Sequence, residues 1–289
     1  MKQQLAISSL MTLSITLGAA CASRTVAATQ PTPVAFDATA SEPKAIATVD
    51  AMTTAVGGAE AWDKVKQISW EHRYTLDGEE KSHVVHAWDM WNGRHRCEMA
   101  DMSSGKVTVD NPNPGPLSYS VAMYDLFDVD STSGHATYGG KEVDSGTRRK
   151  IKASCNQVFA QDSYQLTMHF KLKDPGVKLE SAGQMKDVAR KDGGTMCAPA
   201  CDSVKVTFDP AVGKDTWWIH VNTETHMPEF IEKQVQGGRL AFILGDWITV
   251  GGLKFPQQLQ NAGLTGEIFK ISKIQVGDPD DRLYIPEVR

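Results

Sequence analysis

The sequence predicts a mainly β protein of the α+β class, in which a long antiparallel meander is covered by two or three helices. Apolar and polar residues alternate with a period of two over 68–76, the pattern of a strand with one buried face. Between 203 and 276, further strand-like runs follow one another on short, turn-rich connections such as "NTETHMP" and "VGG". Strands joined in this way pair antiparallel, and their buried face needs helices to cover it.

Residues 1–21 have the features of an export signal. Lys2 supplies a positive charge, and the apolar stretch 5–17 is shorter than the about 20 residues that a membrane-spanning helix needs. Small residues directly precede Cys21, which resembles the lipobox of bacterial lipoproteins, where the cysteine is lipidated and becomes the mature N-terminus. The same small residues also fit an ordinary signal-peptidase site, which would remove Cys21.

Residues 22–42 are rich in Ala, Thr, Ser and Pro and have no apolar periodicity. This composition predicts a flexible tether with a root-mean-square span of roughly 25 Å. We therefore expect a single globular domain over 43–289. If Cys21 carries a lipid, Ala22 behind it favours the outer membrane of the cell envelope, with the domain facing the periplasm.

The domain is expected to begin with a helix over 43–56. Pro43 suits the first turn, an apolar face recurs at helical spacing, and "GG" ends the helix. A short helix precedes the strand over 68–76, and a turn at "LDGEE" leads to a strand near 80–91. "WNGR" then predicts a hairpin with an Asn-Gly turn, through which the chain returns over 94–99.

A second long helix is predicted over 146–161, where apolar residues recur at helical spacing. Turn-rich connections separate all the segments that follow it, so we expect these segments to be strands of one antiparallel meander. They are 164–172, 203–209, 216–222, 229–236, 240–249, 254–260 and 266–276.

Four of the five cysteines remain for pairing once Cys21 is lipidated or removed. An even number of cysteines in an oxidising compartment indicates disulfide bonds. Cys197 and Cys201 are close enough to close the short loop "CAPAC", which leaves Cys97 to pair with Cys155. A structural zinc site needs two close pairs or a pair with histidines, and this sequence favours two disulfides instead. We assign all four a structural role.

The charge balance makes nucleic acid an improbable partner. The formal net charge is −5, and the one dense basic run is "RRKIK" at 148–152, which is typical of a solvated helix face or of a contact with anionic headgroups. The carboxylates of "GDPDD" at 277–281 suggest a solvated turn more than a calcium site. The sequence has no G-x-S-x-G, H-E-x-x-H, P-loop or G-x-G-x-x-G motif, so we expect no enzymatic activity and no cofactor.

Several segments together carry a resemblance to a known family. They are "GGAEAWDKVKQI" (57–68), "DMWNGRHRCE" (89–98), "DSYQLTMHFKLKDPGVKLESAG" (162–183), "DTWWIHVNTETHMPEFIEKQV" (215–235) and "VGGLKFPQQLQ" (250–260). In strand order and turn residues they resemble an exported bacterial branch of the LolA/LolB-like outer-membrane lipoprotein-sorting fold family, and the sigma-factor regulators with the same fold. The resemblance spans nearly all of 43–289 and contains no catalytic motif.

The resemblance implies an open antiparallel half-barrel around an apolar cavity, with the helices as a lid. It also implies a protein that binds or transfers a hydrophobic ligand, such as an acyl chain, another lipid or a lipoprotein. A half-barrel fills its concave face with side chains or leaves room for an apolar ligand. The candidate wall residues are Trp70, Trp88, Trp217, Ile219, Phe242, Leu244 and Trp247. Alternating aromatics in strands are more often core than ligand wall, so an envelope scaffold that acts through protein partners is the alternative.

Histidines on consecutive strands raise a further alternative, a metal-dependent enzyme. Three of them, His72, His86 and His95, share a face of the sheet if the "DGE" turn has three residues. A two-residue turn sets His72 opposite His83 instead. Converging imidazoles are common metal ligands, but partly exposed strand histidines are commoner, and we expect no metal here.

Overall fold

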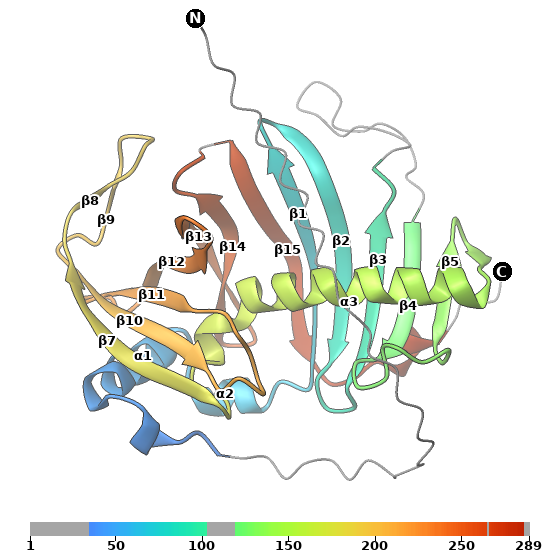
Figure 1. The fold of residues 1–289 in the computed structure, drawn as a ribbon, viewed down its shortest axis with the longest axis horizontal. Helices are drawn as coiled ribbons and strands as arrows, with labels where there is room; N and C mark the ends of the chain where they lie inside the picture. Colours follow the sequence, from blue (N-terminus) through green and yellow to red (C-terminus); the bar gives the residue numbers. More distant parts are fainter. Residues whose placement is uncertain (1–34, 103–118, 265, 286–289) are drawn as a thin grey trace, which may run out of the picture. The chain divides into compact units, whose positions relative to one another are not determined.

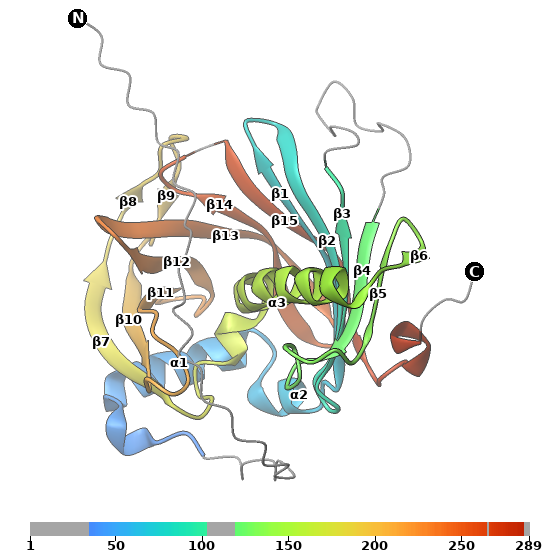
Figure 2. The same cartoon turned by 45° about the vertical axis from the view of Figure 1, so that its right-hand side comes forward.

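The computed structural model describes residues 35–102, 119–264 and 266–285. In this part of the chain, one antiparallel sheet of 13 strands has the order β6-β5-β4-β3-β2-β1-β15-β14-β13-β12-β11-β10-β7. β6 and β7 form the two edges and do not pair, so the sheet is open. This confirms the predicted fold class. The long helix α3 crosses one face, called the inner face below (Figure 1), and the sheet curves around that helix (Figure 2).

The strands form two runs that meet where β1 pairs with β15. The first run consists of β1 (Gln67–Leu76), β2 (Glu79–Asp89), β3 (Arg94–Ala100), β4 (Tyr119–Asp125), β5 (His135–Tyr138) and β6 (Lys141–Glu142). The second consists of β7 (Val177–Met185), β10 (Cys201–Phe208), β11 (Trp217–Asn222), β12 (Pro228–Val235), β13 (Gly238–Val250), β14 (Leu253–Asn261) and β15 (Glu267–Gly277). A small separate hairpin consists of β8 (Val188–Ala189) and β9 (Thr195–Met196).

Three α-helices accompany the sheet: α1 (Pro43–Ala55), α2 (Ala59–Asp63) and α3 (Ser145–Thr167). Short 3-10 turns are η1 (Ala38–Ala40), η2 (Met168–Phe170) and η3 (Asp281–Tyr284). α1 begins with Pro43 in its first turn, as the sequence predicts, and the Asp144 carboxylate caps α3 by accepting from two backbone N–H groups of its first turn. Among the described residues, no helix has the length and apolar character needed to cross a bilayer.

The strand predicted over 164–172 is wrong. The chain there continues α3 to Thr167 and then forms η2. Apolar residues alternate locally in "YQLTMHF", which imitates a strand, but Leu166 also lies on the buried face that α3 has maintained from Ile151 onward. Packing of that face on the sheet overrides the local alternation. The structure also contains β4 to β9, none of which the sequence predicted.

A bulge in the first hairpin decides which way its histidines face. The turn between β1 and β2 has two residues, Asp77 and Gly78, both with positive φ, and Leu76 pairs with Glu79. An unshifted register would then place His72 opposite His83. A register shift between Tyr74 and Thr75 adds one residue to the β2 side, so His72 pairs with Val84 instead. The turn therefore has two residues, yet His72 lies on the same face as His86, as a three-residue turn would have placed it.

The main core lies between the inner face and the helices. It includes Met52 of α1 and Phe159 and Leu166 of α3, packed on apolar side chains from both runs of strands. A second, smaller cluster surrounds the disulfide between β3 and α3. At the end of the predicted tether, the Ser41 hydroxyl and the Glu42 backbone bind the edge strand β7 at Leu179. The described domain therefore includes these two residues.

Candidate functional site

A row of polar side chains lies buried between α3 and the inner face, and we call it the histidine row. All six members are at most 6% exposed. In spatial order they are Gln165, His72, Asp162, His86, His95 and Tyr124. Two come from α3 and one from each of β1 to β4. The register of the β1, β2, β3 and β4 pairs, with the bulge described above, places their side chains on the same face.

The centre of the row is the carboxylate of Asp162. Its Oδ2 lies 3.0 Å from Nε2 of His86 and 3.4 Å from Nδ1 of His72. The other nitrogen of His72, Nε2, is 2.9 Å from Oε1 of Gln165. Two consecutive turns of α3 therefore contact β1 and β2 through polar groups within an otherwise apolar interface.

The outer part of the row runs from His86 to Tyr124. Nδ1 of His86 is 3.1 Å from Nε2 of His95, and Nδ1 of His95 is 3.0 Å from the Tyr124 hydroxyl. A carboxylate only accepts hydrogen bonds, so Nε2 of a neutral His86 donates and its Nδ1 accepts. His95 must then donate from Nε2, and its Nδ1 must accept from Tyr124. The ionised carboxylate of Asp162 thus determines each tautomer out to β4.

Burial controls the ionisation of this row. It lowers the pKa of His86, although the hydrogen bond to Asp162 partly opposes this effect. It also holds the pKa of His95 well below its usual range, and the neighbouring His86 adds to the shift. Burial raises the pKa of the Tyr124 hydroxyl. Both imidazoles are therefore neutral at neutral pH, and Tyr124 keeps its proton.

The histidines predicted as an alternative metal site do come together, but in a different arrangement. His86 uses both ring nitrogens in hydrogen bonds, so its nitrogens do not converge with those of His72 and His95 on one point. Across the described ranges, the one group of potential ligands with all ligand atoms within 4.8 Å is Cys197, Cys201 and Glu229. Those two cysteines are bonded to each other.

Both expected disulfides are present in the structure. Cys97 of β3 is bonded to Cys155 of α3 with a Cα–Cα distance of 5.9 Å. Cys197 is bonded to Cys201 with a Cα–Cα distance of 4.8 Å, and the Cys197 N–H donates to the Glu229 carboxylate at 2.6 Å. The fifth cysteine, Cys21, lies outside the described residues.

The seven candidate wall residues all belong to the main core or pack against it. Trp70, Trp217, Ile219, Phe242 and Leu244 are buried members, and Trp88 and Trp247 are partly buried at its border. Trp70 stacks on the His86 ring with centroids 4.5 Å apart, so the apolar wall and the histidine row are in direct contact. With α3 in place, these side chains are packed against protein.

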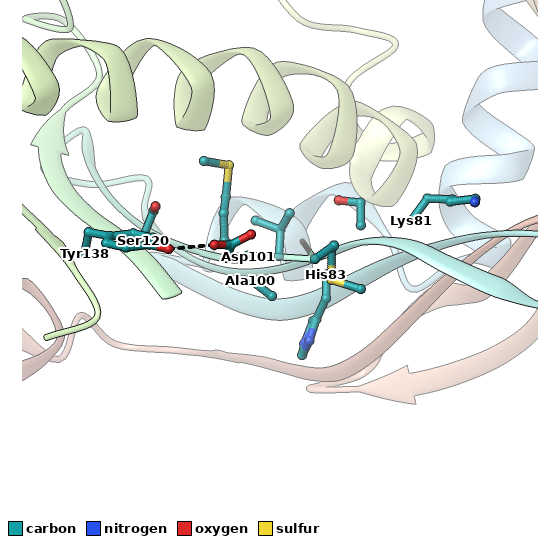
Figure 3. Close-up of a pocket in the computed structure, with 10 residues that line it drawn as sticks. Lys81, His83, Ala100, Asp101, Ser120 and Tyr138 are labelled. Carbon is teal, nitrogen blue, oxygen red and sulfur yellow. Dashed lines mark hydrogen bonds between the residues drawn. The ribbon is translucent and has the colours of Figure 1, made fainter. Parts of the chain in front are cut away.

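A separate cavity of about 250 Å³ lies at the end of β2 to β5. It is lined by Lys81, Ser82, His83, Val84, Met99, Ala100, Asp101, Met102, Ser120 and Tyr138. The Tyr138 hydroxyl donates to Asp101 at 2.6 Å. Figure 3 shows this hydrogen bond as a dashed line and the His83 ring pointing away from α3. None of the candidate wall residues lines this cavity, and its volume is below the roughly 300–1,000 Å³ of typical small-molecule sites.

Two members of the row that sequence reasoning missed, Asp162 and Gln165, had a detectable signal. Ile151, Cys155, Phe159 and Asp162 follow one another at spacings of four, four and three, which is one helix face. Ending the helix at 161 removed Asp162 from that face. Tyr124 had no such signal, because its strand was not predicted.

Comparisons with known proteins give structural similarities only. No protein-family model matches the chain, and no curated protein does. Among solved structures, it is similar to a DUF1329 family protein from Desulfovibrio piger, at 9% identity over 83% of this chain and 97% of the other, with a TM-score of 0.39.

Two further similar structures have names that match the sequence resemblance. One is a LolA superfamily protein from Nitrosomonas europaea, at 9% identity over 81% of this chain and 97% of the other, with a TM-score of 0.39. The other is an outer membrane lipoprotein-sorting protein domain from Vibrio parahaemolyticus, at 7% identity over 83% and 96%, with a TM-score of 0.38. These similarities assign neither activity nor ligand to this chain.

Proposed function

We propose that this protein binds or transfers a hydrophobic ligand, an acyl chain or lipid, on the inner face of its sheet and performs no covalent chemistry. The observation that carries the proposal is the cover of that face. The apolar side chains of both strand runs are closed off by helices instead of a second sheet, and the central helix contacts the strands partly through the buried histidine row. The part of this helix that follows Cys155 has no covalent link to the sheet among the described residues, so it is a separable cover, and separating it exposes an apolar wall.

The ligand would lie where α3 now packs. Phe159 of α3 sits among aromatic rings, with centroids 6.4 Å from Trp70 and 5.2 Å from Trp88. An acyl chain entering there replaces those contacts with others of the same kind, so the apolar area removed from water is nearly conserved. The free-energy cost of opening is then mainly that of breaking the row.

The test is displacement of a fluorescent fatty acid by unlabelled fatty acid from the delipidated full chain. We expect saturable, competable binding. Leu244→Gln places a polar group on the inner face of β13 and should weaken binding about tenfold or more, whereas Ile243→Gln on the opposite face serves as the matched control. Absence of dye binding, or equal loss in both variants, would refute a ligand on the inner face.

We further propose that the protein is exported and anchored in the cell envelope through a lipid on Cys21, with its domain at the outer membrane and facing the periplasm. The export-like segment 1–21 and the two disulfides support this proposal. Intact-mass measurement of protein from its own envelope should give a chain that begins at Cys21 plus a diacylglyceryl adduct. A chain that begins downstream of Cys21 would exclude the anchor.

A protein-partner role is the second candidate, and two exposed aromatic side chains favour it. Trp91 is 73% exposed in the β2–β3 turn, and Phe127, just after β4, is 83% exposed. The Phe127 ring lies directly over Gly93, so both aromatics flank one turn. Crosslinking in intact envelopes should capture a protein partner, such as a lipoprotein. The double variant Trp91→Ser and Phe127→Ser should abolish this crosslink and leave fatty-acid binding unchanged. Unchanged crosslinking in this variant would argue against the candidate.

A further inference from the structure

We propose that the histidine row is an acid-sensitive latch that holds residues 156–167 of α3 on the inner face at neutral pH and releases them in acid, while 145–155 stay attached. The latch deepens the proposed function, because the face it exposes is the proposed ligand site. It rests on that function only for the identity of the site, since release of the helix can be measured without any ligand.

The N-terminal half of α3 is attached by groups that do not change charge in mild acid. Cys155 is bonded to Cys97 of β3. Lys152 is fully buried, and its ammonium donates to three backbone carbonyls, those of Asp128 at 3.2 Å and of Ser131 and Ser133 at 3.0 Å. A lysine ammonium stays protonated as the pH falls, so this attachment persists.

The C-terminal half combines apolar packing in the main core with the polar contacts of the row. Asp162 and Gln165 supply its polar contacts, to His86 and to His72, and Phe159 packs over the rings of His86 and His95. This half has no covalent link to the sheet among the described residues. Every polar contact it makes with β1 and β2 in the row therefore ends on an imidazole.

The row can take up one further proton without losing a hydrogen bond, but not two. While the imidazoles are neutral, every hydrogen bond in the series Tyr124, His95, His86 and Asp162 has one donor and one acceptor. A proton added to His86 forces Nε2 of His95 to accept, which turns N–H of Nδ1 toward the Tyr124 hydroxyl. A second proton, on His95, sets two N–H groups against each other across 3.1 Å. Two buried charges and a lost hydrogen bond then favour release.

The surrounding charges do not relieve this repulsion. Facing the two imidazoles are His72 from β1, Tyr124 from β4 and Asp162 from α3, and the Lys152 ammonium lies 5.9 Å from the centre of the Tyr124 ring. Asp162 is the one carboxylate of the row, and it is shared by His72 and His86. Protonation of both imidazoles therefore adds two positive charges beside a single carboxylate.

The sign of the pH dependence follows from the lowered pKa values of His86 and His95. In the released state both imidazoles are hydrated and titrate near their usual pKa of about 6.5. The released state therefore binds more protons below that pH, and the closed state is fully favoured only above it. Each additional proton raises the opening constant about tenfold per pH unit, or roughly a hundredfold for two.

Hydrogen exchange of the full chain measures release directly, at about pH 7.5 and about pH 5, either side of the free imidazole pKa. After correction for intrinsic exchange, we expect the protection of 156–167 to fall by about a hundredfold or more. The protection of 145–155 and of β12 should change much less. Equal changes in both halves of α3, or no change in either, would overturn the latch.

Variants identify the groups responsible. His95→Gln keeps a polar side chain but cannot titrate, so the acid response of 156–167 should shrink about tenfold or more. His169→Gln is the matched control, because His169 is equally buried but lies in η2 and binds the Lys254 carbonyl outside the row. An acid response that is lost in His169→Gln and kept in His95→Gln would overturn the assignment.

A second variant covers the case in which His95→Gln does not fold. Tyr124→Phe retains the ring and both imidazoles but removes the donor to Nδ1 of His95. That nitrogen is then buried without a partner, which weakens the closed state at every pH, so release should begin at a higher pH than in the unmodified chain. An unchanged midpoint would contradict the role of the row.

Fatty-acid binding in the same two buffers separates the two proposals. Helix release in acid without dye binding at either pH would support the latch and refute the ligand. Dye binding of equal affinity at both pH values, with α3 protected throughout, would support the ligand and refute the latch. Tighter binding in acid together with release of 156–167 supports both.

Discussion

The two halves of α3 are attached to the same face of the sheet by different kinds of interaction. Both lie on the inner face of the sheet, yet 145–155 is attached by a disulfide and a buried ammonium, and 156–167 by hydrogen bonds to imidazoles. The first set does not change charge in mild acid, whereas the proposed latch makes the second set sensitive to it. One continuous helix can therefore be permanently attached at one end and conditionally at the other.

The largest expected effect comes from removing the attachment of the first half. The Cys97–Cys155 disulfide closes a sequence separation of 58 residues, and replacing both cysteines by serine should cost about 4 kcal/mol of unfolding free energy. The Cys197–Cys201 disulfide closes a separation of 4, so the same change there should cost about 2 kcal/mol. Guanidinium unfolding compares the two variants. Equal losses of unfolding free energy would contradict the prediction that the disulfide to α3 stabilises the domain more than the disulfide within the short loop.

Lys152→Met tests the second attachment of the same half. The substitution keeps roughly the length of the side chain but removes an ammonium that donates to three backbone carbonyls. Hydrogen bonds from a charged donor are the stronger kind, so we expect a loss of about 3 kcal/mol of unfolding free energy. The neighbouring Lys150 is exposed, so Lys150→Met is a matched control with little expected change. A loss below about 1 kcal/mol would mean that the carbonyls find other donors.

His169 extends the comparison to the segment that follows α3. Burial lowers its pKa to about 4, against about 6.5 for a free imidazole. The unfolded chain therefore takes up this proton first as the pH falls, and the native state loses up to about 3 kcal/mol between those two pH values. Unfolding of wild type and His169→Gln at neutral pH and near pH 4.5 measures this share. Parallel pH profiles would show that His169 contributes nothing.

The smallest effect is expected at the start of the helix. The Asp144 carboxylate accepts from the N–H groups of Gly146 at 2.8 Å and Thr147 at 3.1 Å. Asp144→Ala should cost about 1 kcal/mol and loosen only the first turn, because the disulfide lies well downstream. Thermal unfolding gives the loss, and exchange of 156–167 serves as the internal control. Faster exchange there would show that the two halves are not independent.

Sequence reasoning found the elements with strong periodicity, because that pattern is local. It also found the cysteine pairing, because the close spacing of Cys197 and Cys201 leaves one partner for Cys97. It could not determine on which face of the sheet His72 lies, since that depends on a bulge between Tyr74 and Thr75 that has no local signature. Asp162 was within reach of the helical pattern but was lost with the helix boundary. The contact between His95 and Tyr124 needed β4, which had no recognisable pattern of its own.

The pairing of β1 with both β2 and β15 has a consequence for how the domain forms. Ile68 is paired with Trp88 on one side, a partner that is synthesised almost immediately, and with Val276 on the other, which arrives some two hundred residues later. Contacts between residues so far apart in sequence form slowly, because the conformational entropy of the intervening chain is lost before the strand pairing stabilises the structure. We expect the late docking of β15 to limit the folding rate. Until it occurs, one long edge of β1 is open to other chains.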